Sequence, residues 1–124
     1  MAIYVKRVYE PASKDDGQRI LVDRLWPRGL SKEQAHIDEW VKVLAPSNEL
    51  RKWFHAHPSE YLEFCLRYRA ELLSSDDAKT EIARFAKLAR HQTVTLLFGS
   101  KSMETNNAVV LAGIVQEWTS NRSL

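Results

Sequence analysis

The sequence predicts an α/β fold, in which helices pack on the faces of a small, mainly parallel β-sheet. Residues 19–25 and 93–98 are apolar runs, as expected of strands that are buried on both faces. The segments between and after them repeat apolar residues at helical spacing, so strands and helices alternate along the chain. The length of 124 residues predicts that residues 1–124 form a single domain.

Two strands are predicted near the start of the chain. Residues 3–9 alternate and are rich in β-branched and aromatic side chains, which favours a strand. Residues 11–18 are polar and predict a turn or a very short helical link to the second strand at 19–25. This link is too short for an ordinary crossover, so an antiparallel first pair, and with it a mixed sheet, is the alternative to parallel pairing. Pro and Gly within residues 26–29 end the second strand in a loop.

Two helices are predicted after this loop. Ser31 and Gln34 form a capping box, which marks the start of the first helix. The apolar side chains that share one face of this helix are Ile37, Trp40, Val41 and Leu44. Pro46 closes it, and Ser47 caps a short second helix that runs to Phe54.

Two longer helices are predicted before the last strand. His57 as N-cap and Pro58 as first helical residue mark the start of one that extends to about Leu73. Its apolar stripe consists of Tyr61, Cys65, Tyr68 and Leu72. Residues 74–77 separate it from a helix that ends near His91.

Composition excludes several classes of protein. Apolar residues make up 44% of the chain and charged residues 27%, which is typical of a folded globule and not of a disordered chain. No apolar run approaches the length of a membrane span, and the N-terminal segment does not resemble a signal peptide. The single cysteine, Cys65, excludes an internal disulfide framework and fits the reducing cytoplasm, where we expect the protein to act. A net charge of +2 is too small to indicate a nucleic-acid partner.

The loops after the two buried strands hold most of the candidate binding residues. Ligands of open α/β sheets bind beyond the carboxyl ends of the strands, where loops and helix N-termini converge. The candidate ligand-binding residues in these loops are Arg24, Trp26, Arg28, Lys101, Asn106 and Asn107. Thr105 is predicted to cap the last helix. Guanidinium groups and helix N-termini bind planar anions, so we expect a phosphate or carboxylate here if the two loops meet.

Two residues, Asp23 and His55, are candidate catalytic proton carriers. The alternative roles of the candidate residues are structural: an ion pair with Arg24 or Arg28 for Asp23, core packing for Trp26, and helix capping for the two asparagines. No metal is predicted, because the two histidines of residues 55–57 do not share a helical face. No cofactor is predicted either, because the glycine spacing of a nucleotide-binding loop is missing.

Residues 22–30 read V-D-R-L-W-P-R-G-L, and further characteristic strings follow at 40–47, 49–55, 67–72, 96–101 and 106–111. On these strings, which span essentially the whole chain, the sequence resembles the YeaO-like branch of the bacterial domain-of-unknown-function family number 488. The resemblance implies a compact intracellular α/β domain and carries over no activity. The signature positions that it suggests are Asp23, Arg24, Trp26, Pro27, Arg28, Trp53, His55, Arg67, Lys101 and Asn106 or Asn107. Relatives often have an acidic residue where this chain has Ser102, and this departure weakens a metal or acid–base role for the last loop.

The leading hypothesis is a small cytoplasmic enzyme, or an enzyme-like domain, that binds an anionic small molecule at the C-terminal edge of the sheet. Phosphate-bearing metabolites or nucleotides are the favoured ligands. Hydrolysis or group transfer fits better than redox chemistry, because no dinucleotide fingerprint occurs. The alternatives are a nucleic-acid-binding module and a regulatory or interaction protein, such as a homodimer joined by exposed aromatic residues.

Overall fold

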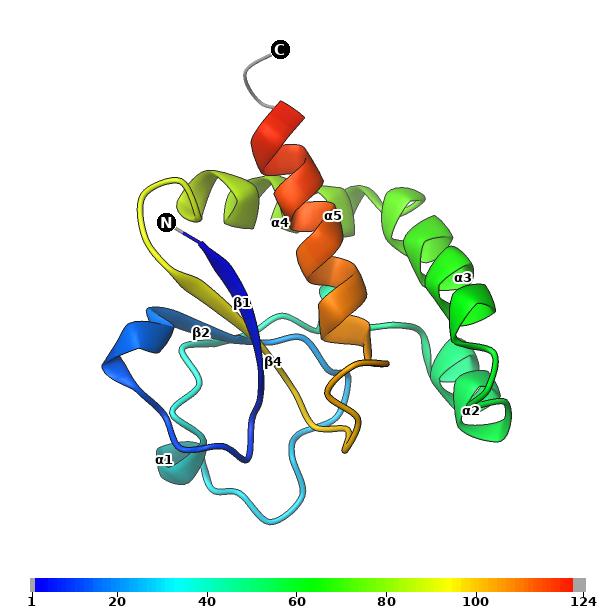
Figure 1. The fold of residues 1–124 in the computed structure, drawn as a ribbon, viewed down its shortest axis with the longest axis horizontal. Coiled ribbons are helices and arrows are strands. Elements are labelled where there is room, and N and C mark those ends of the chain that lie inside the picture. Colours follow the sequence, from blue (N-terminus) through cyan, green and yellow to red (C-terminus); the bar gives the residue numbers. More distant parts are fainter. Residues whose placement is uncertain (1, 122–124) are drawn as a thin grey trace.

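The computed structural model describes residues 2–121. The strands of this part of the chain form a four-stranded sheet in which every neighbouring pair is parallel. The strands are β1 (Ile3–Arg7), β2 (Gln18–Leu21), β3 (Glu39–Trp40) and β4 (Val94–Phe98), in the spatial order β1–β4–β2–β3. Figure 1 shows β4, the last strand in the sequence, between the first two. The predicted α/β fold with a mainly parallel sheet is confirmed.

The antiparallel alternative for the first two strands is wrong. β1 and β2 do not pair with each other, because β4 occupies the position between them and is parallel to both. Val94 of β4 lies opposite Ile3 on one side and Gln18 on the other. All five residues of β4 are buried, as the continuous apolar run predicts for a strand with neighbours on both edges and both faces.

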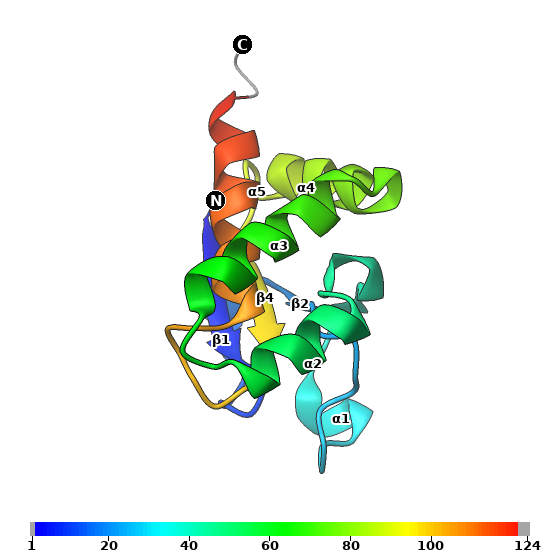
Figure 2. The same cartoon turned by 90° about the vertical axis from the view of Figure 1, so that its right-hand side faces the viewer.

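The helices of the described residues are α1 (Lys32–Ala35), α2 (Asn48–Ala56), α3 (Tyr61–Leu73), α4 (Asp76–Leu88) and α5 (Asn107–Asn121). Two short 3-10 helices, η1 (Lys14–Asp16) and η2 (Lys42–Leu44), precede β2 and α2. α5 packs against α4, β1 and β4, while α2 and α3 lie together at one side of the molecule (Figure 2). No helix within residues 2–121 combines the length and the hydropathy that a membrane span needs.

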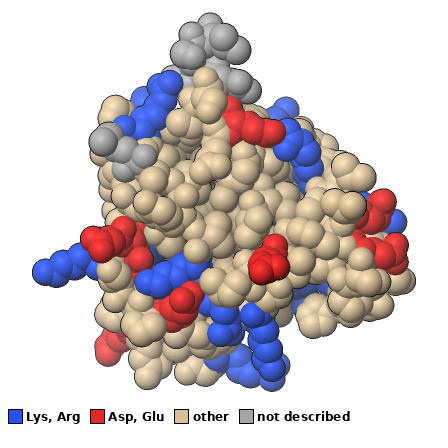
Figure 3. All heavy atoms as spheres, viewed as in Figure 1, with Lys and Arg blue, Asp and Glu red and all other residues tan. Residues whose placement is uncertain are grey.

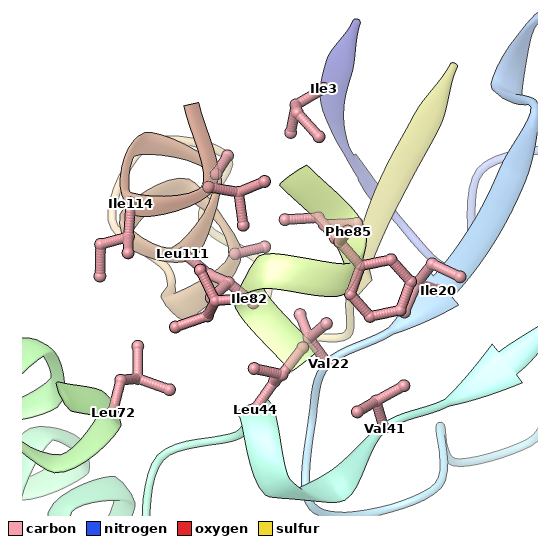
Figure 4. Close-up of a cluster of buried hydrophobic side chains, with 14 of the residues drawn as sticks. Ile3, Ile20, Val22, Val41, Leu44, Leu72, Ile82, Phe85, Leu111 and Ile114 are labelled. Atoms are coloured by element: carbon pink, nitrogen blue, oxygen red, sulfur yellow. The ribbon is translucent and has the colours of Figure 1, made fainter. Parts of the chain in front are cut away.

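The two faces of the sheet carry cores of different size. The larger core lies between one face and the long helices and includes Ile20, Phe85 and Leu111 (Figure 4). The smaller core, on the other face, centres on Leu21 and Leu97 and is covered by α1 and the loop around Trp26. The neighbouring residues Ile20 and Leu21 therefore enter different cores, as expected of a strand that is buried on both sides.

The long helix predicted from residue 31 to Leu44 is wrong in its second half. α1 ends where His36 adopts a left-handed conformation, with φ of 50°. The chain then forms β3 and η2. The apolar residues at helical spacing divide between the two cores: Ile37 and Trp40 pack on the smaller one, and Val41 and Leu44 belong to the larger one. Their spacing therefore reflects a segment that supplies both faces of the sheet at its edge, and not the face of one helix.

The start of α3 also differs from the prediction. Ser47 caps α2 as expected, but His57 ends α2 and does not begin α3, which starts at Tyr61. The His57 ring stacks on Trp53 with centroids 4.8 Å apart, and its Nδ1 lies 2.8 Å from the Trp53 carbonyl. These contacts attach His57 to the preceding helix. The predicted end of α3 at Leu73 is confirmed.

Candidate functional site

β2 and β4 are neighbours, and the loops that follow them are joined through Asp23. The Gly99 N–H donates a hydrogen bond to Asp23 Oδ2 at 2.7 Å, and Asn107 Nδ2 donates to Asp23 Oδ1 at 3.0 Å. Asn107 Nδ2 also donates to the Val22 carbonyl at 3.0 Å. The two loops therefore meet, which is the condition on which the sequence-based site depends.

The same loop sets the start of α5. Asn106 Oδ1 accepts the N–H of Val109 at 2.9 Å, so Asn106, and not the predicted Thr105, caps the helix. The Thr105 hydroxyl lies 2.7 Å from Ser102 Oγ and is bonded within the loop. Asn107 is the first residue of α5 and reaches back to the end of β2. The two asparagines thus have different structural roles, one as a cap and one as a tie between loops.

The surroundings of Asp23 disfavour its charged form. Burial raises the pKa of the Asp23 carboxyl above its ordinary value, and the hydrogen bonds from Gly99 and Asn107, with the charge of Arg51, offset only part of this increase. The phenol of Tyr68 lies near Asp23, and its pKa is raised by its own burial and then by the Asp23 charge. Asp23 forms no ion pair with any described residue, so the predicted ion pair with a neighbouring arginine is wrong.

A cavity of about 580 Å³ opens at this edge of the sheet, lined by the loop after β2, by α2 and by the loop before α5. Its apolar lining residues are Leu25, Pro46, Phe54, Pro58 and Phe64. The Phe54 and Phe64 rings stack with centroids 4.6 Å apart. A largely apolar cavity of this size is typical of a binding site for a small organic molecule.

Three cationic side chains line the same cavity: Arg24, Arg51 and Lys101. Arg24 Nε donates a hydrogen bond to the Pro46 carbonyl at 3.2 Å, which fixes the base of its guanidinium group. Arg51 Nε is buried and has no hydrogen-bond partner within residues 2–121. A buried donor without an acceptor costs about 1–3 kcal/mol, and more when the group is charged. Arg51 Nε is therefore a donor that the described residues leave unsatisfied.

Arg51, Phe54 and His55 reach the cavity from one side of α2, because positions i, i+3 and i+4 of a helix share a face. The start of α2 is anchored to α3: Ser47 Oγ donates to Glu71 Oε2 at 2.6 Å, and the Ser47 N–H donates to Glu71 Oε1 at 2.9 Å. This anchor holds the face of α2 at a fixed position beside the sheet edge.

Elsewhere in residues 2–121, as at this cavity, no three His, Cys, Asp or Glu side chains lie close enough together to hold a metal ion.

Six of the eight residues that the sequence suggests as site residues line this cavity: Asp23, Arg24, His55, Lys101, Asn106 and Asn107. Trp26 and Arg28 do not. Trp26 packs edge-on against Trp40 with ring centroids 5.4 Å apart, and its Nε1 donates to the Leu30 carbonyl at 2.7 Å, so core packing is confirmed for Trp26. Arg28 is exposed, and its carbonyl accepts a hydrogen bond from the Tyr9 hydroxyl at 2.8 Å.

Sequence reasoning missed Arg51 and Phe54 as cavity residues. One signal was available: Arg51 lies one helical turn before His55, so a site that includes His55 on a helix predicts Arg51 beside it. No comparable signal exists for Pro46 and Pro58. They reach the cavity only because α2 folds back beside the sheet, which is a tertiary feature.

Comparisons with known proteins show which family this chain resembles in sequence. Residues 2–123 match the DUF488-N3i family, which is described as the inactive DUF488-N3 subclade. Uncharacterized protein YeaO of Escherichia coli K12 is 48% identical over 112 residues, which cover 90% of this chain and 95% of that protein. Uncharacterized protein Rv3073c of Mycobacterium tuberculosis H37Rv is 40% identical over 113 residues, which cover 91% of this chain and 92% of that protein. No solved structure matches the chain significantly.

Proposed function

This chain belongs to the DUF488-N3i family, and we propose that it binds an anionic small molecule in the cavity at the C-terminal edge of its sheet. The observation that carries the proposal is Arg51 Nε, a buried cationic donor without a partner among the described residues. A phosphate or carboxylate oxygen supplies the acceptor that this donor lacks.

The charges around the cavity support the same proposal. Arg24, Arg51 and Lys101 line it together with one carboxylate, Asp23, whose two oxygens already accept N–H groups. An incoming anion therefore meets an excess of positive charge. In the proposed complex the three cationic side chains hold the anion, and Asn107 keeps the loop that carries Lys101 in place.

We favour binding over turnover because the subclade is described as inactive. Asp23 supplies the half-buried carboxyl group that lines the cavity, and the hydrogen bonds that it accepts from Gly99 and Asn107 give it a positioning role. Asp23 and His55 remain the candidates for proton transfer if the protein also converts its ligand. Such turnover would appear as a new product during incubation with the bound molecule.

A nucleic-acid-binding role is the weaker candidate. On the face drawn in Figure 3, acidic side chains lie among the basic ones, and a wide area between them carries no charge. Proteins that bind nucleic acids without sequence preference usually gather basic residues into a continuous groove or stripe. The cationic residues of the cavity, in contrast, surround a pocket with apolar walls.

A thermal-shift titration tests the proposal. The parent chain, Arg51→Gln and Arg28→Gln are heated with increasing phosphate, acetate, adenosine 5′-monophosphate or a short single-stranded oligonucleotide, at two ionic strengths. A ligand that binds only the folded state stabilises it by about 2.7 kcal/mol at a concentration 100 times its Kd. We expect phosphate to raise the Tm of the parent and of Arg28→Gln, and to raise that of Arg51→Gln much less.

The variants separate binding from general salt effects. Phosphate also stabilises proteins because it is excluded from their surface, and that effect is the same in all three chains. An equal shift in Arg51→Gln and the parent contradicts the proposal. A shift produced only by the oligonucleotide and abolished by salt supports the nucleic-acid role instead.

A further inference from the structure

We infer that the anion is attached to an aromatic ring, so that the cavity binds an aryl phosphate or aryl carboxylate and not a sugar phosphate. This inference rests on the proposed anion site and names the class of its ligand. A cavity of about 580 Å³ is much larger than a phosphate or carboxylate group, so the ligand has a body that fills the remaining space.

The first support is a fixed aromatic surface on the cavity wall. The Phe54 ring stacks on Phe64 at 4.6 Å with an interplanar angle of 25°, and Tyr61 lies 5.8 Å from Phe54. The Tyr61 hydroxyl donates to the Asn106 carbonyl at 3.0 Å, which ties this aromatic cluster to the loop before α5. Phe54 is half-buried and lines the cavity. It therefore offers a ring that is already held in place, against which a planar ligand packs with little loss of entropy.

The second support is an apolar side chain on the cavity wall that is exposed to solvent. Leu25 is 58% exposed and directly follows Arg24, so an apolar and a cationic group adjoin each other on the cavity wall. Arg51 and Phe54 repeat this arrangement on α2, one helical turn apart. A ligand that combines an oxyanion with an apolar ring matches both pairs, and its ring removes the exposed Leu25 surface from water.

The third support comes from the polar side chains of the loop before α5, which already bond to one another. Ser102 Oγ pairs with the Thr105 hydroxyl at 2.7 Å, and Asn106 Nδ2 donates to the Ser102 carbonyl at 3.0 Å. Asn107 Nδ2 donates to Asp23 and to the Val22 carbonyl. The hydroxyl groups of a sugar need free amide, hydroxyl or carboxylate partners. In this loop such side chains already have partners among the described residues, so the cavity offers a ligand mainly cationic donors, the His55 ring and apolar walls.

Isothermal titration with matched probes tests the inference. Phenyl phosphate is compared with methyl phosphate, benzoate with acetate, and ribose 5-phosphate serves as the sugar phosphate. We expect the aromatic member of at least one pair to bind about tenfold more tightly than its non-aromatic counterpart and than ribose 5-phosphate. The pair that shows the larger preference identifies the anion as phosphate or carboxylate.

Two variants assign the preference to the proposed residues. Phe54→Leu keeps an apolar side chain of similar size and removes the flat ring, so it should reduce the aromatic preference, which is the ratio of the two affinities within a pair, to about threefold or less. Arg51→Gln should weaken the binding of every anion. A circular-dichroism spectrum and a Tm close to those of the parent establish that each variant is folded.

The outcomes separate this inference from the proposed function. If no anion binds the folded parent, the proposed function fails and the inference fails with it. If methyl phosphate or acetate binds but neither aromatic probe binds more tightly, the anion site stands and the aromatic class is wrong. An aromatic preference that Phe54→Leu leaves unchanged also overturns the inference.

Discussion

Two aspartates flank β2, and their surroundings differ. Asp16 is the last residue of η1, two positions before the strand begins, and forms ion pairs with Lys6 and with Arg19. Burial alone would raise the pKa of Asp16, but the N–H of Ser13 and the two cations together lower it below the ordinary value. Asp23 follows the strand, forms no ion pair with any described residue, and has a raised pKa.

The arginine that interacts electrostatically with each aspartate shows the same contrast. Arg19 is 4% exposed, yet all three of its guanidinium nitrogens have acceptors: Asp16, the His36 carbonyl at 2.9 Å and the Ala35 carbonyl at 3.0 Å. Arg51 has a buried Nε without a partner among the described residues. An aspartate and an arginine thus form a fully hydrogen-bonded structural network at one end of the strand. At the other end, the same residue types line a cavity in which the arginine keeps an unsatisfied donor. A charged side chain whose buried donors all have acceptors therefore has a structural role, whereas one with a buried donor left unpaired is a candidate binding group, although the residue type is the same.

The largest contrast is expected from removing the two arginines. Arg19→Met leaves the buried Asp16 with Lys6 as its one remaining cation among the described residues and should cost about 3–5 kcal/mol of unfolding free energy. Arg51→Met removes an Nε donor that has no partner among the described residues and should cost less than about 1 kcal/mol. Urea unfolding of both variants and the parent at neutral pH measures the difference. Similar losses in the two variants would show that Arg51 is as structural as Arg19.

A second contrast concerns the glycine beside each aspartate. Gly17 has φ of 62°, and a Cβ placed there would lie 2.1 Å from the Thr93 carbonyl oxygen. Gly17→Ala should therefore cost at least the ~1–3 kcal/mol of a strained backbone, because the neighbouring strand must move. A Cβ at Gly99 would lie 3.2 Å from Asp23 Oδ2, a side-chain atom that can shift slightly. We expect Gly99→Ala to lower the Tm less than Gly17→Ala; the reverse order would contradict this account.

The sequence predicts the fold well where a segment forms one regular strand or one regular helix along its whole length. The apolar run at β4 and the capping serine of α2 are examples. It predicts poorly the segment from Ile37 to Leu44, because those side chains divide between two cores and imitate a helical period. The place of β4 between β1 and β2 depends on contacts between distant parts of the chain, which local patterns do not encode.

The same limit applies to the site. The rule that ligands bind beyond the carboxyl ends of parallel strands correctly predicts that the loops of Asp23 and Lys101 lie at the same cavity. The rule does not predict that Arg24 lines the cavity and Arg28 does not, because both lie in the same short loop. Nor does it include Arg51, which reaches the cavity through the packing of α2 against α3.

The two aspartates should respond to pH with opposite signs. The lowered pKa of Asp16 adds stability above about 3.8, its ordinary value, and this stability is lost as the pH falls through the folded pKa. The raised pKa of Asp23 has the opposite effect, because stability falls as the pH rises from about 3.8 through the folded pKa. Relative to the parent, Asp16→Asn should therefore become more destabilising, and Asp23→Asn less destabilising, as the pH rises from acid to neutral. Urea unfolding across this range checks both signs, and parallel curves would contradict the contrast.

The smallest effect is expected from the substitution of Arg28, and it tests whether the anion site extends along the loop after β2 beyond the cavity. Arg28 lies four residues after Arg24, but the chain turns at Gly29, where φ is 84°, and Arg28 is exposed outside the cavity. Arg28→Gln should change the unfolding free energy by no more than about 0.5 kcal/mol, and phosphate binding by less than about twofold. Arg24→Gln removes a cavity donor and should weaken phosphate binding clearly. If both variants weaken phosphate binding equally, the anion is held along the whole loop after β2 and not within the cavity. The contrast between the two ends of β2 would then rest on Arg51 alone.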